Sequence, residues 1–416
     1  MYLDIFDEIV DIMQNDYAGH LDKRNWDSPS KSHKLIYESH KKGQLNDYQF
    51  VNIVNDYLLD FQDPHVFFTS ASENSESNKD IGFKVRRFKD ALYVTEVLAE
   101  KNVNKGDKII SLDGLPILDL EEIYARELMG EPPERQKWEK IIERHKQVRI
   151  ENTEKNYVDF DLKLYPKKQY IPIHKVDFLS ENTVLMTLSD FFSSEPINEI
   201  LTENKTALNK LDNLIIDVRK NRGGSDSSFN QLLFYLFPSG LSSINLNNYK
   251  MEFNVTDRVA EYQINMLSDM SEKTEDESYK KTLNSMKQFF KTNSGKGLVP
   301  IDNGDSFNIE GTEYPKNIVI LSDMYCGSAG DIFVDFASNS KKVTIIGRET
   351  AGLNDYSNLV KKDWHNKFTL YCPTSRMQYL DNNIKDNGVK PDIYIDWTPE
   401  HIFNDIDLET AIKFLK

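Results

Sequence analysis

The chain has 416 residues, which is enough for two to four domains and a large buried core. Its hydrophobic fraction of 39% and charged fraction of 28% are typical of a soluble globular protein. The net charge of −16 argues against a nucleic-acid backbone or an anionic membrane surface as the main partner. Cys326 and Cys372 are too few for a disulfide framework or a structural zinc site, although one disulfide between them stays open.

Neither a targeting segment nor a membrane segment is predicted. Residues 1–8 lack the basic start of a secretory signal, and acidic residues interrupt the apolar ones. No uninterrupted apolar run approaches 18 residues, so we expect no membrane span. The sequence as it stands predicts a cytoplasmic location, or an exported one if a signal peptide has been removed.

The first 75 residues are predicted to be helical. Apolar residues recur at helical spacing from Ile5 to Met13, and two more helices are expected over Ser32–Lys42 and Asn46–Phe61. The third helix should end at the loop Gln62–His65, because Pro64 disfavours a helical residue before it.

A change of character follows the polar stretch 72–80, which is typical of a linker. Short strands bounded by turns are predicted from residue 81 to about 165, including an Asp-Gly turn at Asp113–Gly114. The expected elements are strands at Ile81–Val85 and Leu92–Val97, a turn and strand in Gly106–Gly114, a helix at Leu118–Met129, and strand material at Val148–Leu164.

From about residue 170 the predicted strands alternate with helices, which indicates α/β layering. A charged, largely helical stretch at about 245–300 interrupts this rhythm and is interpreted as an insertion, a candidate lid or partner surface. The expected strands are Val184–Leu188, Leu214–Val218, Asn317–Leu321 and Val343–Ile346, with helices at Pro196–Leu211 and Ser328–Ser338.

Ser328 begins the helix that follows the buried strand Asn317–Leu321. A hydroxyl at that place lies beside the unpaired N–H groups of a helix N-terminus, which are suited to a developing oxyanion. Gly327 and Ala329 leave room for a carbonyl group to approach. The segment therefore indicates a nucleophile, while an ordinary helix cap remains the alternative.

A second candidate segment is Asp217–Gly224, which follows a strand and ends in two glycines. Paired glycines let backbone N–H groups point at an anion without interference from a Cβ. The spacing fits neither a Walker loop nor a dinucleotide fingerprint. A plain tight turn is the other interpretation.

A serine nucleophile needs a base, and His65 stands out among eight histidines. It lies in a short loop after a helix, preceded by Asp63-Pro64 and followed by apolar residues. A structural histidine is the alternative. Because no HExxH or comparable ligand spacing occurs, we expect no metal and no cofactor.

Together these segments resemble the C-terminal processing peptidases and their tricorn-core and interphotoreceptor-retinoid-binding-protein-like relatives. The resemblance spans nearly the whole chain. It rests on five elements in the family's order, namely Ile81–Phe83 with Gly106–Gly114, then Asp217–Gly224, Ser328–Asp331, Gly347–Gly352 and Gly388–Asp392.

The resemblance implies an α/β fold with a stacked β/α catalytic core, similar to crotonases and Clp proteases. It also implies an N-terminal helical region and a PDZ-like domain. The corresponding boundaries are 1–75 for the helical region, 76–168 for the PDZ-like domain, and 169–416 for the catalytic core with its helical insertion.

The family has two catalytic arrangements, and the sequence favours one of them. Processing peptidases use a Ser–Lys dyad, but Leu353 occupies the lysine's place here. The branch that includes the tricorn core and the chlamydial protease-like activity factor uses Ser–His with a carboxylate. Asp63-Pro64-His65 matches its Asp-x-His loop, and the implied carboxylate is Asp386, with Glu349 as second choice.

The resemblance thus implies a serine endopeptidase that forms an acyl-enzyme on Ser328 with His65 as general base. Gly224 and Ala329, with Gly223, are the expected oxyanion-hole residues. The expected partner is a peptide or unfolded protein, and a homo-oligomer stays open.

Three alternatives remain at this stage. A catalytically silent relative could bind peptides or retinoid-like ligands in the same cleft, in keeping with Leu353 and the missing glutamate. A crotonase-type acyl-CoA enzyme is disfavoured by the PDZ-like module and the Asp-x-His loop. Cys326 is a weaker nucleophile candidate, because it precedes the helix start by two residues.

Overall fold

The computed structural model describes residues 1–416 except 72–78, 130–131, 247–248, 276, 303 and 380–387. The described chain forms two compact units, each built from separate stretches of sequence. The first unit comprises 1–72, 241–310 and 351–388, and the second comprises 73–240, 311–350 and 389–416. The three-part division at residues 75 and 168 stays a prediction. The predicted linker at 72–80 lies mostly outside the described residues.

Three helices open the first unit, close to where the apolar periodicity places them. They are α1 (Tyr2–Asn15), α2 (Pro29–Lys41) and α3 (Asp47–Leu58), followed by the 3-10 turn η1 (Leu59–Phe61). Helix α3 begins at a capping box in which Asn46 and Gln49 exchange side-chain and backbone hydrogen bonds. None of the helices that the structure describes is long and apolar enough to cross a bilayer.

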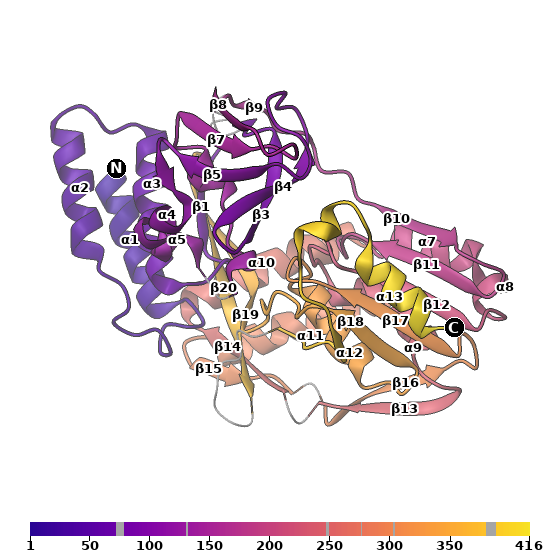
Figure 1. The fold of residues 1–416 in the computed structure, drawn as a ribbon. Coiled ribbons are helices and arrows are strands. Elements are labelled where there is room, and N and C mark those ends of the chain that lie inside the picture. The colour runs from indigo at the N-terminus through magenta and orange to yellow at the C-terminus, as the bar shows by residue number, and fades with distance from the viewer. Residues whose placement is uncertain (72–78, 130–131, 247–248, 276, 303, 380–387) are drawn as a thin grey trace. The chain divides into compact units, whose positions relative to one another are not determined.

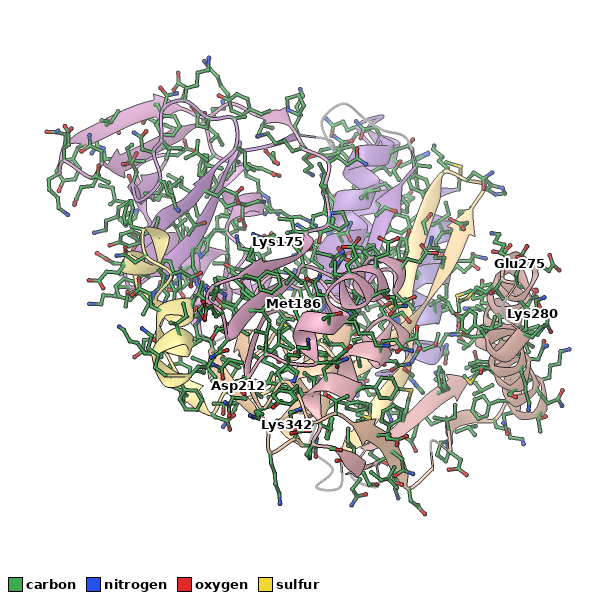
Figure 2. All side chains as sticks on the ribbon, turned by 90° about the vertical axis from the view of Figure 1, so that its right-hand side faces the viewer. Lys175, Met186, Asp212, Glu275, Lys280 and Lys342 are labelled. Carbon is green, nitrogen blue, oxygen red and sulfur yellow. The ribbon has the colours of Figure 1, made fainter. Side chains whose placement is uncertain are left out.

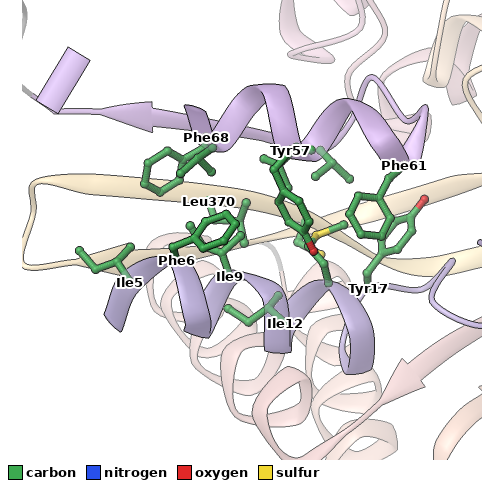
Figure 3. Close-up of a cluster of buried hydrophobic side chains, with 14 of the residues drawn as sticks. Ile5, Phe6, Ile9, Ile12, Tyr17, Tyr57, Phe61, Phe68 and Leu370 are labelled. Carbon is green, nitrogen blue, oxygen red and sulfur yellow. The ribbon is translucent and has the colours of Figure 1, made fainter. Parts of the chain in front are cut away.

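These helices pack on a five-stranded sheet drawn from both ends of the chain. Its order is β1 (Phe67–Ser70), β20 (Phe368–Tyr379), β14 (Tyr249–Val255) and β15 (Gly297–Pro300), and β19 (Tyr356–Trp364) also pairs with β20. Figure 3 shows Phe6, Tyr57 and Leu370 in one buried cluster between the helices and the sheet. Burial of these aromatic and aliphatic side chains holds the helices on the sheet.

The stretch predicted as a helical insertion does contain two long helices, α10 (Asp257–Lys273) and α11 (Glu277–Asn293). Strands β14 and β15 flank the pair, so this stretch also contributes to the sheet of the first unit. Apolar residues around Phe253, Leu267 and Phe290 form the core between the pair and its strands. Figure 2 labels Glu275, which precedes α11, and Lys280, which lies in the first turns of α11.

The second unit begins with an antiparallel sheet over residues 83–161. Its strands are β3 (Phe83–Phe88), β4 (Ala91–Val97), β5 (Lys108–Leu112), β7 (Gln147–Glu151) and β8 (Tyr157–Asp161), and β6 (Leu115–Pro116) pairs with β5. The helix predicted over Leu118–Met129 is divided at Tyr124 into α4 (Ile117–Ile123) and α5 (Ala125–Leu128). Trp138 is fully buried in the core of this region.

A parallel sheet forms the rest of the second unit (Figure 1). Its order is β10 (His174–Phe178), β11 (Thr183–Leu188), β12 (Asn213–Asp217), β17 (Asn317–Ser322), β18 (Val343–Gly347) and β21 (Ile393–Tyr394). Only the edge strand β10 is antiparallel to its neighbour. The central strands are buried on both faces, so they read in sequence as continuous apolar runs.

Helices cover this parallel sheet. Ala411 of α13 (Ile406–Phe414) packs with Ile215 and Val319, whereas Phe333 of α12 (Ala329–Ser338) belongs to another buried aromatic cluster, with Phe191 and Phe229. The helix predicted over Pro196–Leu211 is divided into α7 (Glu195–Glu203) and α8 (Lys205–Leu208). The residue between them is Asn204, whose side chain bonds the Ile200 carbonyl and competes with the helical backbone.

The parallel strands fix where the candidate residues emerge. In register, Asp217 of β12 lies opposite Leu321 of β17, and Ser322 lies opposite Gly347 of β18. The carboxyl ends of these three strands therefore meet at one edge, where sites in such sheets form. At the opposite end of the strands, Lys342 donates hydrogen bonds to three carbonyls, that of Tyr235 in α9 (Asn230–Leu236) and those of Phe237 and Thr312. Lys342 is labelled in Figure 2.

Candidate active site

Ser328 lies on the turn between β17 and α12 in a backbone conformation that is rare for a residue with a side chain. Its φ is 58° and its ψ is −122°. Such conformations cost about 1–3 kcal/mol and persist where the surrounding structure enforces them. The half-buried hydroxyl makes no capping hydrogen bond to α12, so Ser328 does not act as an ordinary helix cap.

The glycine loop after β12 packs directly against this serine. A Cβ on Gly223 would lie 2.7 Å from Cβ of Ser328 and 2.6 Å from the carbonyl oxygen of Gly327. Gly223 also has a φ of 74°, which disfavours any side chain. The predicted proximity of Gly223 and Ser328 is therefore real, and it requires glycine.

Asn221 joins the glycine loop to the serine turn. It is fully buried, its Oδ1 accepts the N–H of Gly223 at 2.9 Å, and its Nδ2 donates to the Leu188 carbonyl at 3.0 Å. Its own carbonyl accepts the N–H of Gly327 at 3.1 Å. Asn221 had no predicted role, although it stands within the Asp217–Gly224 element.

Two N–H groups beside Ser328 are available as oxyanion donors. Gly224 forms an isolated β-bridge with Phe191. The hydrogen bonds of this bridge join Phe191 to the carbonyl of Gly223 and to the N–H of Ser225, so they do not use the N–H of Gly224. Ala329 is the first residue of α12, where N–H groups have no intrahelical partner. Within the described backbone, no hydrogen bond is donated by Gly224 or Ala329.

The N–H of Gly223 differs, because it is already donated to Asn221. Gly223 therefore contributes space and shape to the predicted oxyanion site in this conformation, rather than a hydrogen bond.

Buried ion pairs hold the segment that leads to the serine. Asp323 accepts two hydrogen bonds from Arg86 of β3, at 2.8 and 3.1 Å, and one from Arg348 at 2.9 Å. Arg348 in turn bonds Asp407, which also pairs with Arg219. Burial would raise the pKa of Asp323, but the two guanidinium groups outweigh burial and lower it. The carboxylate is thus ionised and fixed five residues before the nucleophile candidate.

Cys326 is fully buried, and burial is the main cause that raises the pKa of its thiol well above the ordinary value. A protonated, inaccessible thiol is a poor nucleophile. Both cysteines are free, so the disulfide left open by the sequence is absent from the described residues.

The predicted base His65 lies in the first unit, on a loop held by side-chain hydrogen bonds. The carboxylate of Asp63 accepts hydrogen bonds from the backbone N–H of His65 at 2.9 Å and from the hydroxyl of Tyr17 at 2.8 Å. The buried amine of Lys23 donates to the carbonyl of Phe61 at 2.7 Å. These bonds fix the backbone on both sides of Pro64 and so limit where the imidazole can point.

Asp63 is also the acid that pairs with the imidazole of His65 among the residues that the structure describes. Its Oδ1 lies 3.8 Å from Nδ1 of His65, too far for a hydrogen bond but close enough for electrostatic attraction. Asp63 marks the Asp-x-His loop in the sequence but had no predicted role of its own.

The two acids predicted as the third catalytic residue remain untested. Asp386 lies outside the described residues. Glu349 follows β18 with a half-buried side chain and forms no ion pair among the residues that the structure describes. The neighbouring Thr350 anchors this segment, because its hydroxyl accepts the N–H of Val389 at 2.7 Å.

Residues 182–395 match the model of peptidase family S41, and this range is a little over half of the chain. The chain therefore belongs to peptidase family S41, and the resemblance seen in the sequence is confirmed. At the level of the family, the protein is a serine peptidase. No curated protein matches the chain.

Solved structures agree with this assignment. Mature CPAF complexed with lactacystin has a TM-score of 0.67 and 15% identity, with 100% of this chain and 97% of that chain covered. Mature CPAF alone gives a TM-score of 0.67 and 16% identity, covering 100% and 96%. A putative peptidase from Parabacteroides merdae gives 0.51 and 13%, covering 100% and 96%. At these identities the likeness establishes the fold, and the predicted α/β fold class is confirmed.

Proposed function

We propose that this serine peptidase hydrolyses peptide bonds through an acyl-enzyme on Ser328, with His65 as the general base. The observation that carries the proposal is the strained Ser328 turn, packed against a glycine loop with two undonated N–H groups beside it. A non-glycine residue held at positive φ between a strand and a helix is typical of an exposed nucleophile.

In the proposed reaction, Nε2 of His65 takes the proton of the Ser328 hydroxyl as Oγ attacks the peptide carbonyl carbon. The N–H groups of Gly224 and Ala329 hold the oxyanion, and each such donor contributes roughly 10²–10³ in rate. His65 returns the proton to the leaving amine as the C–N bond breaks. Water then attacks the acyl-enzyme with the same base and releases the acid.

We further propose Asp63 as a carboxylate that supports His65, beside the two acids expected from the family. The bond from Tyr17 supports this role because it holds Asp63 in place. Burial and the neighbouring Asp63 raise the pKa of the Tyr17 hydroxyl, so it stays a donor at all ordinary pH values. Asp386 and Glu349 remain candidates, and single Asn or Gln variants of all three acids would rank them by loss of kcat.

Labelling with a fluorophosphonate probe tests the nucleophile and the base. We expect labelling of the wild type, none of Ser328→Ala, and strongly slowed labelling of His65→Ala. Ser338→Ala, at the other end of α12, and His33→Ala, on the surface of α2, are matched controls that should label like the wild type. Equal labelling of Ser328→Ala would refute the proposed nucleophile.

A wild type that binds peptides but is neither labelled nor hydrolytic would instead favour the silent relative. The observation that favours a silent relative is Leu353, which stands in place of the catalytic lysine of the Ser–Lys branch.

A further inference from the structure

Arg222 presents a charged side chain immediately before the two glycines of the candidate site. Its backbone N–H is donated to the Ser189 carbonyl at 3.0 Å, which ties the residue to the sheet. The exposed Arg222 side chain places its guanidinium over the ring of Tyr170, with Cζ 3.9 Å from the ring centroid. Stacking on an aromatic face orients a guanidinium while leaving its N–H edge free.

Tyr170 is itself held rigidly beneath this guanidinium. Its hydroxyl donates to Oδ2 of Asp190 at 2.7 Å and lies 2.8 Å from Oγ of Ser189. Asp190 is 1% exposed, its Oδ1 accepts the N–H of Phe192, and its carbonyl lies 3.0 Å from Nε2 of His174. The ring under Arg222 is therefore a fixed surface and not a mobile side chain.

Phe192 adds an apolar wall to this surface. Its ring is 59% exposed and lies 6.2 Å from the ring of Tyr170 in an edge-on arrangement. The preceding residue, Phe191, is bridged to Gly224, so the chain places Phe192 directly beside the glycine loop. We call Tyr170, Phe192 and Arg222 together the aromatic–arginine platform.

The platform lies within reach of a substrate attached to Ser328. The contact between Gly223 and Ser328, combined with the fixed spacing of consecutive Cα atoms, places Cα of Arg222 within about 8 Å of Cβ of Ser328. An extended peptide advances about 3.3–3.6 Å per residue. A side chain one or two residues from the scissile bond can therefore contact the platform.

The charge of Arg222 is not used within the described protein. Arg219, three residues earlier, pairs with Asp217, Asp405 and Asp407. In contrast, Arg222 makes no ion pair with any residue that the structure describes, although the chain carries a net charge of −16. A lone, oriented guanidinium in an acidic protein is suited to a carboxylate from outside.

We propose that the aromatic–arginine platform binds an acidic side chain of the substrate, one or two residues from the scissile bond. The carboxylate bonds the edge of Arg222, and the methylene groups pack on Phe192. This specificity rests on the proposed function for its placement at a scissile bond. The binding of a carboxylate to the platform can be measured without catalysis.

The binding test uses Ser328→Ala as the background, so that peptides are not consumed. Fluorescence anisotropy compares peptides that differ only by Glu or Gln at one position, each with a free or an amidated C-terminus. We expect the Glu peptide to bind about tenfold tighter than the Gln peptide, with both types of C-terminus. A preference that follows the C-terminus alone, or none at all, would overturn the proposal.

Variants of the glycine loop distinguish binding by the platform from a general attraction of positive charge for the Glu peptide. Arg222→Gln should abolish the Glu preference, and Arg222→Lys should keep only part of it, because lysine does not stack. Lys220→Gln, an exposed cation two residues earlier, should leave the preference intact. Equal effects of Lys220→Gln and Arg222→Gln would overturn the proposal.

The same peptides, tested with the catalytic serine present, distinguish the two proposals. Fluorophosphonate labelling without a Glu preference in binding or kcat/KM leaves the proposed function standing and refutes the platform. A Glu preference in binding, without labelling, leaves the platform standing and refutes the proposed mechanism.

Discussion

The turn that carries Ser328 and the loop that carries His65 are both short, yet they are held in different ways. The serine turn depends on backbone, because glycines, a buried asparagine and a positive φ leave no freedom around it. The histidine loop depends on side chains, because Asp63 accepts the backbone N–H of His65, Tyr17 holds the Asp63 carboxylate, and Lys23 donates to the Phe61 carbonyl. For the function proposed above, the difference implies a preorganised nucleophile and oxyanion site, and a base that its neighbours can tune.

The largest effect is expected where charge supports the serine turn. Arg348→Met leaves Asp323 and Asp407 buried with one guanidinium partner fewer each, which should cost about 3–5 kcal/mol of stability. Arg149→Met, which breaks an exposed pair with Asp159, should cost far less, because water screens that pair. Urea unfolding measures both, and equal losses would show that the network does not matter.

Asn221→Ala tests whether the Asn221 side chain holds the glycine loop against the serine turn. The change leaves the Gly223 N–H and the Leu188 carbonyl unpaired, at roughly 1–3 kcal/mol each, and should also abolish probe labelling. Asn209→Ala, on an exposed helix end, is the control. Full labelling of Asn221→Ala would mean that the turn holds its shape without the asparagine.

Gly223→Ala separates steric crowding from backbone strain. The new Cβ would meet Gly327 and Ser328 at under 3 Å, so we expect roughly a 10²–10³-fold loss of labelling rate, comparable to losing an oxyanion donor. Gly114→Ala has a similar positive φ of 80° with nothing nearby, and should cost only stability. Similar labelling rates in the two variants would exclude crowding as the cause.

Tyr17→Phe probes the histidine loop with a conservative change. Losing the bond to Asp63 should cost about 1 kcal/mol and lower kcat severalfold, because Asp63 then holds the loop less firmly. Tyr57→Phe removes the hydroxyl of a similarly buried tyrosine, whose bond to Asp27 is partly buried, and should cost no more stability and leave kcat unchanged. The measurement is kcat and the free energy of unfolding for both variants. Equal kcat values for Tyr17→Phe and Tyr57→Phe would argue against a role of Asp63 in the mechanism.

The smallest effect concerns the strain at Ser328. Ser328→Gly should be more stable than Ser328→Ala by about 1 kcal/mol, because only glycine adopts this φ without cost. Thermal unfolding of the two inactive variants measures the difference. If Ser328→Ala were as stable as Ser328→Gly, the turn would store no backbone strain.

Much of the candidate site around Ser328 could be predicted from the sequence, because its motifs consist of consecutive residues. The order of strand, turn and helix around Ser328 and the paired glycines are written in consecutive residues, and the structure brings Gly223 and Ser328 into contact. The role of Asn221 was hidden, because it depends on the Leu188 carbonyl of another strand. The stack of Arg222 on Tyr170 was hidden for the same reason.

The first unit was less predictable, because its sheet is assembled from distant segments. The helical stripes of α1 and α3 were evident, since they follow a short period. The pairing of β1 and β14 with β20 leaves no such trace in the sequence. His65 could be recognised from its Asp-x-His loop, but the bonds from Tyr17 and Lys23 required the fold.

The pairing of β1 with β20 has a consequence for biosynthesis. Phe67, two residues after the candidate base, pairs with Tyr371, some 300 residues later in the chain. At about 5–20 residues per second, the ribosome delivers that partner roughly 15–60 s after β1. The sheet beside His65 can therefore close only after residue 371 has been made, and the ion pair of Arg348 with Asp407, which helps to hold the serine turn, forms later still. We expect chains that end before β20 to lack activity.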